Sequence, residues 1–108
     1  MRTFFGGTLV EQEILEEAGI NYPIKLEYYK KIDDEKTRKV NQAKYGISII
    51  KKEYINNKIK VETKDINNIT NDEIVENRIL EIFAHNTVMP ENSEEILLEL
   101  LAQRFMRF

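Results

Sequence analysis

The sequence predicts an α+β fold in which two C-terminal helices cover one face of a three-stranded antiparallel sheet, with a short helix at the N-terminus. Apolar and polar side chains alternate around residues 24–28, 45–49 and 59–63, which is the period of a half-buried strand. Within residues 70–105 the apolar side chains recur at helical spacing instead. A run of strands followed by a run of helices is typical of α+β proteins.

The size and composition predict one soluble domain. The chain has 108 residues, 42% of them hydrophobic and 32% charged. A chain of this length can bury one core without disulfides or metals to support it. Within residues 1–108 we expect a helical segment at 1–23, the sheet at 24–66 and the helical pair at 70–105.

The first element is predicted as a short helix over residues 9–18. Its apolar positions fall at helical spacing: Leu9, Val10, Ile14, Leu15 and Ala18. The acids Glu11, Glu13, Glu16 and Glu17 occupy the other face. Gly19 is a plausible stop, because glycine adopts the left-handed conformation that ends many helices.

Two predicted strands flank a polar loop. Ile24, Leu26 and Tyr28 alternate with charged residues after Pro23, and residues 33–44 are polar without a period. Tyr45, Ile47 and Ile49 then resume the alternation.

The next turn, at Asn56-Asn57, raises a question of register. A two-residue loop there would place Ile47 and Ile49 on the same face as Lys58, Lys60, Glu62 and Lys64. One buried face does not accept that arrangement. The pattern therefore favours a three-residue loop, Ile55 to Asn57, with a bulge at Ile49-Ile50 as the alternative.

Two helices are predicted to follow. Thr70 to Glu73 spells a capping box, and Ile69 with Ile74 forms a hydrophobic staple, so the first helix is expected to start at Asn71 and to end at His85-Asn86. Its apolar stripe is Val75, Ile79, Ile82 and Phe83, with Leu80 on the flank. A second helix is expected from about Glu91 to about Arg104, and the short connector favours antiparallel packing.

Charge is segregated along the chain. Residues 25–64 hold twelve Lys/Arg against six Asp/Glu, whereas residues 65–108 hold three against nine. The net charge of −3 is therefore the sum of a basic middle segment and acidic segments on either side of it. The chain has no cysteine, which excludes disulfides, thiolate zinc sites and cysteine nucleophiles and suits a reducing cytoplasm.

Residues 45–104 carry short motifs that together suggest a relationship. They are Tyr45-Gly46-Ile47, the approach from Ile66 to Thr70, the segment Asn86-Thr87-Val88-Met89-Pro90 and the closing Glu95-Ile96-Leu97-Leu98-Glu99. This stretch resembles an uncharacterised family of small proteins from low-GC Gram-positive bacteria, a domain of unknown function. The resemblance implies no activity.

Little in the sequence points to catalysis. His85 is the only histidine, and at a helix C-terminus its structural role is favoured. The acids Asp33, Asp34 and Glu35 are flanked by lysines, so mutual neutralisation on a solvated loop explains them as well as acid–base or metal chemistry does. We expect no enzymatic activity, no cofactor and no metal.

The basic, tyrosine-bearing middle suggests one binding surface. Lysines around exposed aromatic side chains on a sheet can hold single-stranded nucleic acid. The competing interpretation is that lysine merely solvates strands and guards sheet edges. The residues of this possible anion or nucleic-acid surface are Lys51, Lys52, Lys58, Lys60, Lys64 and Tyr54.

The C-terminal helix and its end suggest another surface, and we prefer it. The residues of this possible partner surface are Leu98, Phe105, Met106 and Phe108. Exposed apolar side chains would bind a protein partner or a second copy, unless the helix simply continues and packs Phe105 and Phe108 on the sheet. We therefore expect a cytoplasmic protein-interaction or regulatory module, with nucleic-acid binding as the alternative and no membrane span.

These expectations share one geometric assumption. The apolar residues of the strands and of both closing helices face one interior, and the cationic side chains lie outside it. In particular Lys58, Lys60 and Lys64 are expected away from the helices.

Overall fold

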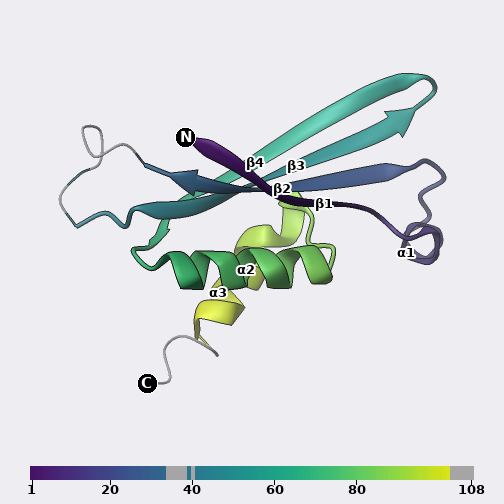
Figure 1. Ribbon diagram of the computed structural model, residues 1–108. Coiled ribbons are helices and arrows are strands. Elements are labelled where there is room, and N and C mark those ends of the chain that lie inside the picture. Colours follow the sequence, from purple (N-terminus) through teal and green to yellow (C-terminus); the bar gives the residue numbers. More distant parts are fainter. Residues whose placement is uncertain (34–38, 40, 103–108) are drawn as a thin grey trace.

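The protein folds as a four-stranded antiparallel sheet with two helices on one side and a short helix at one end of the sheet (Figure 1). The computed structural model describes residues 1–33, 39 and 41–102. The strands lie in chain order, β1-β2-β3-β4. The elements are β1 (Arg2–Leu9), α1 (Gln12–Glu17), β2 (Ile24–Ile32), β3 (Tyr45–Ile55), β4 (Lys58–Thr70), α2 (Glu73–His85), the 3-10 helix η1 (Pro90–Asn92) and α3 (Ser93–Leu100).

The prediction of three strands with a helix ahead of them is wrong. Arg2–Leu9 forms a fourth strand that pairs with β2, and α1 comes after it and is only six residues long. Leu9 therefore ends a strand rather than starting a helix. Two glycines in this segment disfavour a helix, and at Gly7 a Cβ would come within 3.2 Å of the Leu26 carbonyl oxygen, so the close strand pairing suits glycine there.

The core lies between the sheet and the C-terminal helices. Figure 1 shows α2 lying along one side of the sheet, with α3 running obliquely to it. Residues that alternate along β2 and β3 face α2, as the strand periodicity predicts. The fully buried apolar residues of these three elements are Ile24, Leu26, Tyr28, Ile47, Ile49, Ile79, Leu80 and Phe83.

The turn between β3 and β4 corrects the predicted register. The loop holds two residues, not three, because Ile55 pairs with Lys58. Asn56 and Asn57 both have positive φ, 50° and 66°, the combination that two-residue hairpin turns require. Asparagine adopts this conformation more readily than most residues, so the turn chemistry decides the register.

This register also overturns the assumption about the lysines. Ile47 pairs with Ile66 and Ile49 with Lys64, so Lys64 lies on the same face as the buried isoleucines. Lys58 and Lys60 share that alternation. The sheet accepts this because β4 is an edge strand: Lys64 pairs with Glu94 of α3, and Lys58 and Lys60 are exposed.

The far end of the hairpin contains an irregularity that returns the chain toward α2. Pairing shifts between Tyr45 and Ile47, and Asn68 has a positive φ of 56°. Gly46 lies against this bulge, where a Cβ would be 2.9 Å from the Asn67 Cα and would collide with the Ile66 carbonyl oxygen. Only glycine fits this close approach of two backbones.

The start of α2 also differs from its prediction. Thr70 is the last residue of β4, and the N-cap is Asp72, whose carboxylate accepts a hydrogen bond of 2.9 Å from the Ile74 amide. Ile74 is exposed, so no staple with Ile69 closes the helix start. The helix ends at His85, as predicted.

Candidate functional site

One face of the sheet remains uncovered by any described element. We call it the open face, and it carries the side chains that alternate with the buried core positions of β2 and β3. Those of β2 to β4 are Lys25, Glu27, Tyr29, Lys31, Ser48, Ile50, Lys52, Tyr54, Ile59, Val61, Thr63 and Asp65. Phe4 joins them from β1, where it packs edge-to-face on Tyr29 at a centroid distance of 5.5 Å.

Three apolar side chains of the open face gather near the tip of the β3–β4 hairpin. Tyr54 pairs directly with Ile59, and Val61 follows two residues later on the same face. Tyr54 is 37%, Ile59 59% and Val61 57% exposed. We call Tyr54, Ile59 and Val61 the hairpin patch. The two-residue turn creates it, because any one-residue shift would send Ile59 and Val61 to the other face.

Most charged groups of the open face are paired with one another, whereas Arg2 of β1 donates a hydrogen bond to the Ser48 hydroxyl at 3.4 Å. Glu27 is nearly buried and accepts hydrogen bonds from the Tyr29 hydroxyl at 3.0 Å and from Lys52 Nζ at 3.3 Å, with Lys25 Nζ at 3.6 Å. Burial alone would raise the pKa of Glu27, but these hydrogen bonds and positive charges outweigh burial and lower it. The centre of this face is therefore a cluster in which two lysines share one carboxylate, rather than a row of free cations.

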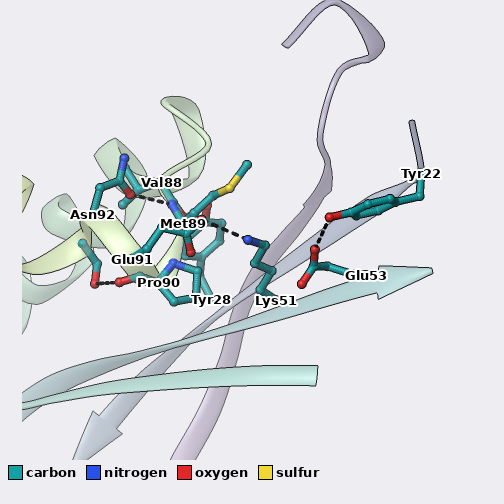
Figure 2. Close-up of polar contacts among 10 residues, drawn as sticks. Tyr22, Tyr28, Lys51, Glu53, Val88, Met89, Pro90, Glu91 and Asn92 are labelled. Atoms are coloured by element: carbon teal, nitrogen blue, oxygen red, sulfur yellow. Dashed lines mark hydrogen bonds and ion pairs between the residues drawn. The ribbon is translucent and has the colours of Figure 1, made fainter. Parts of the chain in front are cut away.

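The helix-facing side of the sheet carries a different polar row (Figure 2). Lys51 Nζ lies 2.9 Å from Glu91 Oε1 of η1, and the Tyr28 hydroxyl donates to the Val88 carbonyl oxygen at 2.8 Å. The desolvation of Lys51 would lower its pKa, but the nearby carboxylates, Glu91 foremost, more than offset it and raise the pKa. These contacts hold η1 and α3 against the sheet.

The same row continues toward the N-terminal helix. The Tyr22 hydroxyl donates to Glu53 Oε2 at 2.7 Å, and this acceptor raises the pKa of Tyr22. Tyr22 also lines a mainly apolar cavity of about 530 Å³ beside α1, together with Leu9, Val10, Leu15, Ile20 and Ile24. Besides Tyr22, the polar residues that border this cavity are Gln12, Glu16 and Asn21. Gln12 and Glu16 hydrogen-bond to each other, and these residues form no catalytic set.

The structure does not gather the six predicted anion-binding residues on one face. Lys52 and Tyr54 lie on the open face, whereas Lys51 and Lys64 lie on the helix side in ion pairs with Glu91 and Glu94. The exposed Lys58 and Lys60 share the alternation of Lys64. Nucleic-acid binding stays a prediction, and its residues are divided between two surfaces.

The predicted partner surface is described only at Leu98. This side chain is 68% exposed on α3. Phe105, Met106 and Phe108 lie outside the described residues, and so do Asp34 and Glu35 of the acidic loop cluster. The hairpin patch is the surface that sequence reasoning missed, although the Asn56-Asn57 pair carried the signal for the turn that exposes it.

Glu76 of α2 is a second residue that the sequence did not single out. It is 1% exposed, and within the described residues neither carboxylate oxygen has a hydrogen bond of normal geometry. The nearest cation is Lys30, whose Nζ lies 4.0 Å from Glu76 Oε1 and 2.7 Å from Glu73 Oε2. Burial raises the pKa of Glu76 to about 7, against the lowering effect of Lys30 and of the Lys31 backbone.

Metal and membrane sites find no support in the part of the chain that is described. Residues 1–33, 39 and 41–102 contain no group of three His, Cys, Asp or Glu side chains placed to hold a metal ion. None of the helices described here has the length and apolar character needed to cross a membrane.

Comparison with known proteins adds a family but no activity. The pattern of a family of unknown function (DUF6514) matches residues 8–103, which is most of the chain, so the chain belongs to this family. No curated protein and no solved structure matches it.

Proposed function

We propose that this member of the DUF6514 family is a non-enzymatic protein-interaction module that binds its partner through the hairpin patch. The observation that carries the proposal is the contiguous exposure of Tyr54, Ile59 and Val61 on the uncovered face of the sheet. Single exposed apolar residues are normal on protein surfaces, whereas neighbouring ones on a face without a covering layer mark a binding surface.

The charges around the patch favour a protein over a polyanion. Lys25 and Lys52 pair with Glu27, and Lys31 Nζ lies 3.4 Å from Asp65 Oδ2. Phosphate groups would have to compete with these carboxylates for the same cations. An apolar partner surface need not disturb these pairs.

A capture experiment tests the proposal. Wild-type protein and the double variant Ile59→Thr/Val61→Thr are used as baits in extract of the native cell. The variant keeps β-branched residues in β4 and removes apolar surface. We expect the proteins captured by the wild type to be at least tenfold depleted with the double variant.

Leu98→Gln is the matched control, because Leu98 of α3 is also more than half exposed. Capture with Leu98→Gln should equal that of the wild type. If Leu98→Gln loses the partners and the strand variant keeps them, the helix surface binds and the hairpin patch does not.

We further propose a cytoplasmic location and an origin in low-GC Gram-positive bacteria. The absence of cysteine supports a reducing compartment. The resemblance of the motifs in residues 45–104 to that family supports the proposed bacterial origin. Cell fractionation with an antibody to the native protein would test the location.

A further inference from the structure

Among the residues that the structure describes, the outer edge of β4 is the longest strand edge without a partner strand. β4 is the last strand in the sheet order, and no described segment pairs with its outer side. It runs for 13 residues, Lys58–Thr70, without proline or glycine. Natural edge strands are usually short or interrupted, because a free row of N–H and C=O groups is a template for another strand.

The two-residue turn determines which backbone groups face that edge. In such a hairpin the residues that flank the turn, Ile55 and Lys58, form a hydrogen-bonded pair. Hydrogen-bonded pairs recur at every second residue along an antiparallel ladder. The N–H and C=O groups of Ile59, Val61 and Thr63 therefore point away from β3, toward the free edge.

The side chains of these same residues lie on the open face. Ile59 and Val61 are more than half exposed and contribute to the hairpin patch. One stretch of β4 thus offers free main-chain groups at its edge and apolar side chains on one face. This is the combination that strand addition uses.

We infer that β4 pairs antiparallel with β4 of a second copy of this chain, about a two-fold axis at Val61. The two sheets then form one continuous sheet with both hairpin patches on the same face. This inference rests on the proposed function, since it names the partner of the hairpin patch. Three residue pairs, Val61 with Val61 and Ile59 with Thr63 on either side of the axis, would exchange about six hydrogen bonds.

At the centre of the interface, charge favours this register over its neighbours. An axis at Lys60 would put Lys60 opposite Lys60, and an axis at Glu62 would put Glu62 opposite Glu62, and like charges directly opposite are destabilising. An axis at Val61 instead sets Lys60 opposite Glu62 twice. Both side chains are exposed and available for this pairing.

The outer positions are less favourable, because Lys58 falls opposite Lys64 of the second copy. The ion pair of Lys64 with Glu94 of its own α3 offsets this repulsion. Shifting the axis to Thr63 would place Val61 opposite Asp65 and lose the apolar contact at the centre.

Charge reversal provides the test, read as mass by sedimentation equilibrium from ~1 to ~200 μM. The wild type should approach twice the monomer mass as concentration rises. Lys60→Glu creates repulsion at both cross-strand pairs, and so does Glu62→Lys, so each variant alone should dimerise about thirtyfold more weakly. The double variant Lys60→Glu/Glu62→Lys restores both pairs and should regain the wild-type mass.

A mixture of the two single variants gives the most discriminating test of the register. Lys60→Glu presents two acids and Glu62→Lys presents two lysines, so an equimolar mixture should form a heterodimer although neither component dimerises well alone. Val61→Pro removes an outward N–H without touching the ladder to β3 and should stay monomeric. A wild type that remains monomeric across the range, or a dimer that persists in Val61→Pro, overturns the inference.

The result is separable from the proposed function. If the wild type is monomeric but Ile59→Thr/Val61→Thr still loses captured proteins, the hairpin patch binds a different protein and only the self-pairing fails. If the dimer forms as described, the hairpin patch is a binding surface even when the capture experiment finds no other protein.

Discussion

At the scale of single residues, Glu76 is the group least suited to its surroundings. An isolated carboxylate is strongly disfavoured in an apolar interior, and it responds by holding its proton. Lys30 is close enough to attract Glu76, but it makes its shorter contact with the exposed Glu73. The carboxyl of Glu76 is therefore poised to titrate near neutral pH.

Replacing Glu76 should change how stability depends on pH. Its pKa is about 7 in the folded protein and near 4.5 when unfolded, so the folded state binds the extra proton between these values. The free energy of unfolding of the wild type should fall as pH rises from about 4.5 to about 7, by up to about 3 kcal/mol from this group. Glu76→Gln should remove this fall and be more stable than the wild type at pH 8. Urea unfolding of both proteins across pH 4–8 measures this dependence of the free energy of unfolding on pH.

Glu73→Gln is the control for that experiment. It removes the other carboxylate beside Lys30 from a side chain that is half exposed. Glu73 contributes least among the influences on the pKa of Glu76, so the stability of Glu73→Gln should keep most of the wild-type pH dependence. Equal slopes for Glu76→Gln and the wild type would show that Glu76 is not the titrating group.

At the scale of elements, short polar side chains decide where β4 turns and where α2 begins. Asn56 and Asn57 set the hairpin register through their left-handed conformation. The Thr70 hydroxyl accepts a hydrogen bond of 3.0 Å from the Asp72 amide, while the Asp72 carboxylate caps the helix at Ile74. The sequence motif at 70–73 thus marks a helix start, but Thr70 remains in the strand because it pairs with Tyr45.

Two substitutions separate the observed cap from the predicted one. Asp72→Ala should lower the free energy of unfolding by about 1 kcal/mol, because an N-cap side chain is lost. Thr70→Val keeps a branched side chain in the strand and removes only the hydroxyl, so it should cost less than about 0.5 kcal/mol. Thermal or urea unfolding ranks the two. A larger loss in Thr70→Val would mean that Thr70 is the effective cap.

At the scale of the whole molecule, the segregated charges meet across the sheet–helix interface. The basic middle of the sequence supplies Lys30, Lys51 and Lys64 from the strands. The acidic end supplies Glu73, Glu91 and Glu94 from the helices and η1. Charges that are segregated along the chain thus pair with each other in the fold. This pairing explains why Lys51 and Lys64 are not free to form an anion-binding surface.

A double-mutant cycle measures one of these pairs. Lys51→Ala and Glu91→Ala should show a coupling energy of about 0.5–1 kcal/mol, because Lys51 is largely buried and Glu91 half exposed, and the coupling should shrink in 1 M salt. Lys58→Ala with Glu91→Ala is the matched control and should show none. Equal coupling in both cycles would assign the effect to net charge rather than to the contact.

The sequence by itself determined the α+β class, the strands β2 and β3 with their apolar core residues, and the end of α2 at His85. These follow from local periodicity, which a burial face imposes directly on the sequence. The first strand was not predictable in this way, because Arg2–Leu9 is a strand only through its pairing with β2.

Only the tertiary structure decided the register of β4, and with it the open face and the hairpin patch. Periodicity assigned Ile59 and Val61 to the core, since an alternating strand was assumed to bury its apolar side. In the folded protein the turn fixes the pairing, and Glu94 of α3 pairs with Lys64, which the pairing brings to the covered side. The apolar side of an edge strand is then left facing outward, an outcome that depends on contacts between segments far apart in the chain.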